Sequence, residues 1–148
     1  MIDQIRALEA LLARVKRASG PSREIDAWVH LIFVNEGRTG VFESPEAWVR
    51  FAVVQKWNTG RYTSSLEAGL HLVRHILPGA MWAVGCMEGG PFCRLVYPTG
   101  LSGGWGHTVS MEQEGGPDSE PLAILCCLIS ARLALLTAGA TGARKIRG

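Results

Sequence analysis

The segment that most constrains the fold is residues 61–79, RYTSSLEAGLHLVRHILPG, which contains a helix start, an apolar face and a helix stop. Ser64 is followed three residues later by Glu67, the spacing of a capping box, in which each side chain satisfies a backbone N–H at the helix start. The pattern therefore predicts a helix that begins near Ser65 and ends before Pro78. Its apolar face is formed by Leu66, Leu70, Val73 and Leu77, with a gap for close packing at Gly69.

The next segment predicts a β-hairpin over residues 81–97. Two apolar runs flank Gly89 and Gly90, which can supply the positive φ angles of a tight turn. The expected cross-strand pairs are Met87 with Phe92, Cys86 with Cys93, Gly85 with Arg94, Val84 with Leu95, Ala83 with Val96 and Trp82 with Tyr97. A third strand is expected near residues 105–111. Both faces of this sheet are largely apolar, so we expect both to be covered.

Apolar residues at helical spacing predict four further helices, which gives about five in an α+β fold. They are expected over residues 2–18, from 21 or 22 to about 33, from 44 to about 57, and from about 119 to 138. Ser44 and Pro45 form a clear helix start, although the β-branched residues of 49–54 leave a strand open there. The last helix is apolar almost all round, which predicts deep burial or an oligomer interface, most simply in a dimer.

The composition indicates one globular domain over residues 1–148, with residues 139–148 as a flexible basic tail. Hydrophobic residues make up 47% of the chain and charged residues 19%, values that exclude a disordered protein. A net charge of +2 does not indicate a nucleic-acid partner. Residues 122–138 fall short of the roughly 20 residues of a membrane span and contain Arg132, so we interpret them as a core helix and expect no membrane partner.

The first helix alternates charged and apolar residues and does not resemble a signal peptide, which predicts a cytoplasmic protein with reduced thiols. The four cysteines, Cys86, Cys93, Cys126 and Cys127, contain no C-x-x-C pair, so no zinc site is expected. His71 and His75 have a metal-binding spacing but no third ligand. We therefore expect no metal and no cofactor.

The candidate site is the start of the 61–79 helix, where basic and hydroxyl side chains meet the positive end of the helix dipole. Anions bind such places. The candidate residues there are Lys56, Arg61, Tyr62, Thr63, Ser64 and Ser65. Arg94 could approach from the sheet, and Trp105 and His107 complete the candidate set, since a tryptophan can stack on a base. His107 lacks the orienting carboxylate of a nucleophilic triad. The alternative is that this region is only a helix cap with surface charge beside it.

Three stretches, SGPSREID at 19–26, YTSSLEAGL at 62–70 with WAVG at 82–85, and EPLAILCCL at 120–128, resemble small phage and prophage proteins of the phage ABA-sandwich type. The likeness covers about half of the chain. This sequence departs from the usual pattern at Glu67 for Asp, Gly69 for Ala and Glu120 for Thr, and residues 34–59 match no part of it. The resemblance implies a three-layer α/β/α sandwich, with helices on both faces of a small antiparallel sheet.

The resemblance and the lack of catalytic residues predict a non-catalytic phage or prophage accessory protein that antagonises a host defence system. We expect it to act in the bacterial cytoplasm by sequestering a small anionic ligand such as a nucleotide signal. The alternative is an inhibitor or adaptor that binds a host protein through an apolar surface, together with the glycine-rich loop at residues 100–106. The sequence contains no recognisable catalytic motif, so we do not expect an enzyme.

Overall fold

The computed structural model describes residues 3–87, 90–98, 105–110 and 119–147, without the side chains of residues 87, 105–110 and 139–147. The described residues form five α-helices, a short π-helix and three strands. Their order is α1 (Gln4–Arg17), α2 (Arg23–Val29), η1 (His30–Val34), α3 (Pro45–Val54), α4 (Leu66–Ile76), β1 (Met81–Met87), β2 (Gly90–Pro98), β3 (Trp105–Ser110) and α5 (Glu120–Arg147). The α+β class is therefore confirmed.

Local capping sets the start of most helices. The hydroxyl oxygens of Ser22, Ser44 and Ser119 accept hydrogen bonds from backbone N–H groups in the first turns of α2, α3 and α5. These three starts confirm the sequence-based expectations. The helix α3 ends at Val54, earlier than expected, and the π-helix η1 continues α2 without a break.

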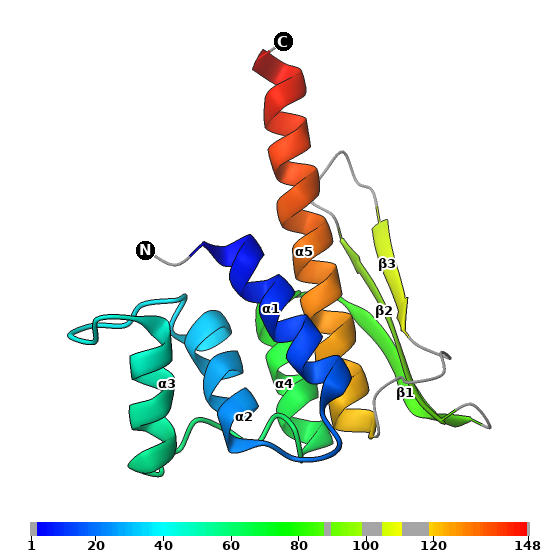
Figure 1. Cartoon of the computed structure of the whole chain (residues 1–148). Coiled ribbons are helices and arrows are strands. Elements are labelled where there is room, and N and C mark those ends of the chain that lie inside the picture. The colour runs from blue at the N-terminus through cyan, green and yellow to red at the C-terminus, as the bar shows by residue number, and fades with distance from the viewer. Residues whose placement is uncertain (1–2, 88–89, 99–104, 111–118, 148) are drawn as a thin grey trace.

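The core is organised around the first half of α5. Its side chains from Leu122 to Ile129 are fully buried, because α1 and α4 pack against one side of the helix and the sheet against the other (Figure 1). Gly69 allows α4 to approach closely, since a Cβ at that position would lie 3.1 Å from Cγ2 of Ile124. The predicted deep burial of the last helix is confirmed for this half.

The second half of α5 extends beyond the body of the protein and continues through Arg147 (Figure 1). The segment expected to be a basic tail from residue 139 therefore has helical backbone, and its side chains lie outside the described part. Among the described residues, one segment, Glu120–Ala138, is long and apolar enough to cross a membrane by length and composition. Half of the most apolar stretch of this segment is buried against the rest of the chain.

The sheet is antiparallel, with β2 between β1 and β3. The expected hairpin register is wrong by two residues: Met87 pairs with Gly90 and Val84 with Cys93, so that Cys86 lies opposite Pro91. A shift of two keeps each side chain on the face predicted for it.

Among the described helices, α5 packs on the sheet and contacts all three strands. Cys93, Leu95 and Tyr97 of β2 are buried toward this helix, whereas Arg94 is exposed. The apolar pattern predicts cover on the second face and the resemblance implies helices there, and the described contacts do not place any on that face. The three-layer arrangement thus stays a prediction.

Candidate binding surface

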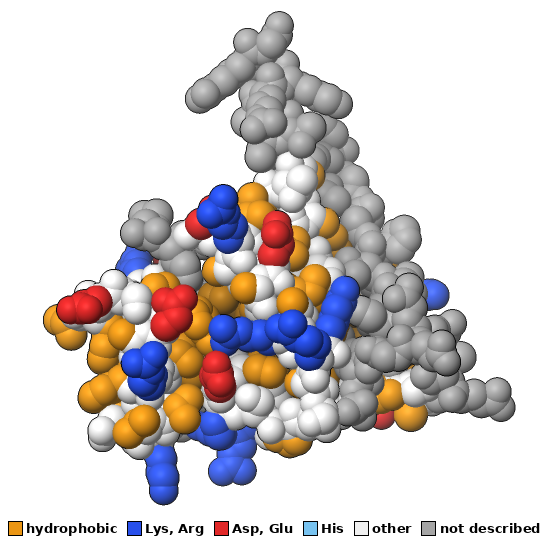
Figure 2. Space-filling view, viewed as in Figure 1, with side chains coloured by type: hydrophobic (Ala, Val, Ile, Leu, Met, Phe, Trp, Pro, Cys, Tyr) orange, Lys and Arg blue, Asp and Glu red, His pale blue; other side chains and the backbone are white. Residues whose placement is uncertain are grey.

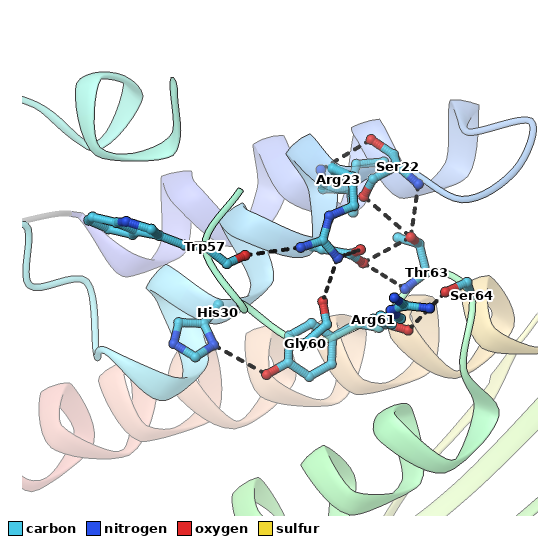
Figure 3. Close-up of polar contacts among 11 residues, drawn as sticks. Ser22, Arg23, His30, Trp57, Gly60, Arg61, Thr63 and Ser64 are labelled. Atoms are coloured by element: carbon cyan, nitrogen blue, oxygen red, sulfur yellow. Dashed lines mark hydrogen bonds and ion pairs between the residues drawn. The ribbon is translucent and has the colours of Figure 1, made fainter. Parts of the chain in front are cut away.

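The loop between α3 and α4, residues 55–65, carries most of the candidate residues, and a buried carboxylate holds it in place. Asp26 of α2 is 2% exposed, and its Oδ1 accepts hydrogen bonds from the backbone N–H of Thr63 at 2.8 Å and from the Thr63 hydroxyl at 2.9 Å. The Thr63 hydroxyl oxygen also accepts from the backbone N–H of Ser22 at 2.9 Å (Figure 3). Thr63 and Asp26 therefore join the loop to the start of α2.

Arg23 holds the other end of the same loop. Its guanidinium pairs with Asp26 Oδ2 at 3.2 Å and donates to the carbonyl oxygens of Trp57 and Gly60 at 3.0 and 3.3 Å (Figure 3). Burial raises the pKa of Asp26 above its ordinary value, against the lowering effect of the Thr63 hydrogen bonds and of Arg23. Arg23 is thus committed to structure rather than available to a ligand.

A second polar contact lies behind this loop. The Nδ1 atom of His30 lies 3.4 Å from the Tyr62 hydroxyl (Figure 3), and the imidazole stacks at 11° on the ring of Trp48. Burial lowers the pKa of His30, opposed by a hydrogen bond with the backbone of Thr59. Burial also raises the pKa of Tyr62, helped by the charge of Asp26. Both pKa shifts favour the uncharged forms of the imidazole and the phenol.

The predicted capping box, in which Ser64 caps the helix, is wrong. The N-cap of α4 is Ser65, whose Oγ accepts from the backbone N–H of Ala68 at 3.1 Å. The backbone N–H groups of Ser64 and Ser65 instead donate to the carbonyl oxygen of Arg61 at 3.1 and 2.8 Å. The Ser64 hydroxyl donates to the same oxygen at 3.4 Å (Figure 3). Because Thr63 is bound to Asp26, the chain turns once more before the helix begins, and these N–H groups are already satisfied.

Three of the nine candidate residues, Lys56, Arg61 and Ser64, line one groove of about 760 Å³, which we call the cationic groove. Arg23, Asp26, Val53 and Trp57 also line it. Three cationic side chains and one carboxylate give this groove a formal charge of +2. Among the described residues, neither Lys56 nor Arg61 forms an ion pair.

The other candidate residues are not brought to the groove. Tyr62 and Thr63 are buried in the contacts above, and Ser65 is the helix cap. Arg94 is exposed on β2, on the far side of α5 from α2 (Figure 1). The side chains of Trp105 and His107 lie outside the described residues, as does most of the glycine-rich loop.

The sequence did not predict an exposed apolar surface on α3 and the segments next to it, which we call the α3 patch. Its residues and exposed fractions are Val41 at 95%, Phe51 at 41%, Val53 at 38%, Val54 at 68% and Trp57 at 36%. The helical spacing of Trp48, Phe51 and Ala52 predicts a buried stripe that includes Phe51. In the structure, α2 covers the side formed by Trp48, Val49 and Ala52 and leaves Phe51 exposed. Figure 2 shows hydrophobic side chains gathered over α3 and between α3 and α1.

Aromatic rings support this patch from within. The ring of Trp57 lies 5.2 Å from that of Phe51 and 5.5 Å from that of Trp48, and Phe42 lies 5.1 Å from Phe51. These are edge or tilted contacts of the kind that stabilise aromatic clusters. The exposed rings are therefore held in place before any partner binds.

Three of the four cysteines, Cys93, Cys126 and Cys127, are buried, and Cys86 is exposed. All four are unbridged. The Cys127 thiol donates to the carbonyl oxygen of Cys93 at 3.1 Å. A hydrogen bond with Cys127, together with burial, raises the pKa of Cys93, and burial raises that of Cys126 to about 12. Such thiols stay protonated and unreactive. Within the described ranges, no group of three or more metal-ligating side chains is found, and His71 and His75 are exposed on α4.

Comparisons of this chain with protein-family models, with curated proteins and with solved structures found no match.

Proposed function

We propose that this chain is a non-catalytic accessory protein of a phage or prophage, and that it antagonises a host defence system in the bacterial cytoplasm by binding a host protein through the α3 patch. The phage origin and the host-directed role come from the sequence resemblance. The choice of a protein partner comes from the structure. The single observation that carries it is the exposure of a preformed aromatic and aliphatic surface on α3.

The composition of the α3 patch supports this choice. Tryptophan and phenylalanine are enriched in protein interfaces, and tryptophan is also enriched among the residues that contribute most of the binding energy. Trp57 and Phe51 are held by their ring contacts, so binding orders few side chains and loses little conformational entropy. Arg50 on α3 and Lys56 just after it are exposed and can form a polar rim. Exposed apolar patches rimmed by polar residues are typical of interaction sites, which supports this assignment.

A second candidate is the capture of a small anionic ligand, such as a nucleotide signal, in the cationic groove. The formal charge of +2 and the lack of ion pairs on Lys56 and Arg61 favour it, and its volume is within the roughly 300–1,000 Å³ range of small-molecule sites. The backbone donors expected to bind the anion, at Ser64 and Ser65, are already bonded to Arg61. For this reason the protein partner ranks first.

Purification from phage-challenged host cells distinguishes the two candidates. A host protein that co-purifies in stoichiometric amount, with a heat-denatured extract free of nucleotides, supports binding through the α3 patch. A stoichiometric nucleotide in that extract supports the cationic groove. If a nucleotide is found, Arg61→Ala should weaken its binding by about 1.5–3 kcal/mol, the size of a charge-assisted hydrogen bond, with the melting temperature unchanged.

We also propose that the chain forms a dimer in which the second face of the sheet is covered by the partner copy. The first half of α5 is buried within its own chain, so it does not supply that interface. On the sheet, Met81 is 59% exposed. Covering this face would meet the expectation that both faces of the sheet are covered. Light scattering that gives a monomer at micromolar concentration would contradict this proposal.

A further inference from the structure

Arg132 is the one charged residue in the apolar stretch of α5 over residues 122–138. The residue is partly buried, and among the described residues its side chain has no ion-pair partner. Taking a charge out of water costs free energy unless a partner replaces the water. An arginine at this position is therefore a candidate to pair with an anion from outside the chain.

Arg132 lines a cavity of about 630 Å³, which we call the Arg132 pocket. The pocket lies between α5, the end of α4, the start of α1 and the turn that follows η1. Its volume is within the roughly 300–1,000 Å³ range of small-molecule sites. It shares no lining residue with the cationic groove and contains none of the α3 patch. The Arg132 pocket is therefore a separate cavity.

The charged residues that line the Arg132 pocket leave one cation without a counter-charge. Glu36 and Arg38 both line it and pair with each other at 3.4 Å. With His75 neutral, the remaining formal charge is the +1 of Arg132. One carboxylate balances that charge, whereas a phosphate monoester carries about −1.5 to −2 at pH 7. The charge therefore favours a ligand with a single carboxylate.

Apolar side chains also line the Arg132 pocket. Leu8, Ile32 and Phe33 are buried members of the core, and the partly buried Ile76 packs against that core. A methylene chain that contacts these side chains is removed from water, which favours binding. The pocket therefore suits a ligand with one anionic end and one apolar end.

The backbone at the edge of the Arg132 pocket is irregular. The π-helix η1 leads to Glu36, whose φ of 54° lies in the left-handed region. The N–H of Gly37 donates to the carbonyl oxygen of Leu31 at 2.8 Å. Glu36 and Gly37 both line the pocket. π-helical turns and left-handed residues other than glycine are frequent at functional sites, which agrees with a binding role for this cavity.

We propose that the Arg132 pocket binds a small monocarboxylate with an apolar chain. The carboxylate pairs with the guanidinium of Arg132, which can donate two parallel hydrogen bonds to it, and the chain contacts Ile32 and Phe33. The inference does not depend on the proposed function, because no residue of α3 takes part in it.

Three eight-carbon probes test the proposal by calorimetric titration of the full-length protein. Octanoate has one carboxylate and an apolar chain, and we expect a dissociation constant on the order of 0.1–1 mM. Octanamide has the same chain without the charge, and suberate has a second carboxylate at the far end of the chain. Both should bind about tenfold more weakly or worse, since one lacks the ion pair and the other places a charge against apolar side chains.

Each probe also has a result that contradicts the proposal. Octanoate that does not bind overturns it as a whole. Octanamide that binds as tightly as octanoate overturns the assignment of an anionic ligand. Suberate that binds as tightly as octanoate overturns the contact between the chain and the apolar side chains.

Matched arginine variants and NMR locate the bound carboxylate. Arg132→Gln should weaken octanoate binding by about tenfold or more, whereas Arg74→Gln, on α4 outside the pocket, should leave it unchanged. Unchanged affinity in Arg132→Gln overturns the proposal. In ¹⁵N-labelled wild-type protein, octanoate should shift the amide resonances of residues 36–39 and not those of residues 51–57. The opposite pattern overturns the proposal even if Arg132→Gln does not fold.

Discussion

The backbone N–H and the hydroxyl of Thr63 both contact the same carboxylate oxygen of Asp26, at 2.8 and 2.9 Å. Thr63→Val removes the hydroxyl, which takes a donor from a buried carboxylate and leaves the backbone N–H of Ser22 without this acceptor. We expect the free energy of unfolding, measured by urea denaturation, to fall by about 2–4 kcal/mol. Thr63→Ser keeps the hydroxyl and is the control. A loss in Thr63→Ser as large as that in Thr63→Val would contradict this account, because the serine variant loses only a methyl group and keeps the hydroxyl.

Ser65 and Ser64 should respond differently to substitution by alanine, although they are adjacent. Ser65→Ala removes the N-cap of α4 and should lower the free energy of unfolding by about 1 kcal/mol. Ser64→Ala removes a hydroxyl that is exposed and makes only a 3.4 Å bond to Arg61, so it should change stability by less than about 0.5 kcal/mol. Thermal unfolding of the two variants side by side gives the comparison. The reverse order would mean that the helix begins one residue earlier.

His30 should make stability depend on pH below neutrality. Its pKa is lowered in the folded protein from the ordinary value of 6.5, so the unfolded chain binds a proton at His30 more readily than the folded chain does. The free energy of unfolding should therefore decrease as the pH falls through 6.5 toward the folded-state pKa. In His30→Asn, which does not titrate there, urea denaturation between pH 7 and pH 5 should show a smaller decrease. An unchanged slope would assign the pH dependence to other groups.

Lys56 occupies a backbone conformation that favours glycine. Its φ is 54°, and the N–H groups of Lys56 and Trp57 close the C-terminus of α3 onto Val53 and Ala52 in the pattern of a Schellman motif. Lys56→Gly should therefore raise the free energy of unfolding by about 0.5–1 kcal/mol. Lys56→Ala removes the same charge but keeps the strained backbone, so it should bring no such gain. A gain in both variants would point to charge repulsion in the cationic groove instead.

The helices could be predicted from the sequence because their starts depend on local groups. Ser22, Ser44 and Ser119 cap the helices that follow them through hydrogen bonds spanning three residues. The start of α4 shows the limit of this reasoning. Ser64 and Ser65 are equally good caps by type, and the choice between them is made by Thr63, which is held by Asp26 at a sequence distance of 37 residues.

The hairpin register and the candidate surface also depend on contacts between distant parts of the chain. The expected and observed registers differ by two residues and place every side chain on the same face, so the apolar alternation cannot distinguish them. Phe51 belongs to an apolar helical stripe, and its exposure follows only from the position of α2. The cationic residues Lys56 and Arg61 were identified from the sequence, whereas the apolar surface beside them was not.

Substitution of Val54 tests the central claim, binding of a host protein through the α3 patch, most directly. Val54 is 68% exposed within the patch, and Val34, at the end of η1, is 43% exposed outside it. The measurement is the amount of host protein captured from phage-challenged cells by the wild-type chain, by Val54→Glu and by Val34→Glu, at equal amounts of folded protein. We predict a loss of about tenfold or more for Val54→Glu, the effect of placing a charge in an interface, and no loss for Val34→Glu. Equal capture by all three proteins would contradict the account.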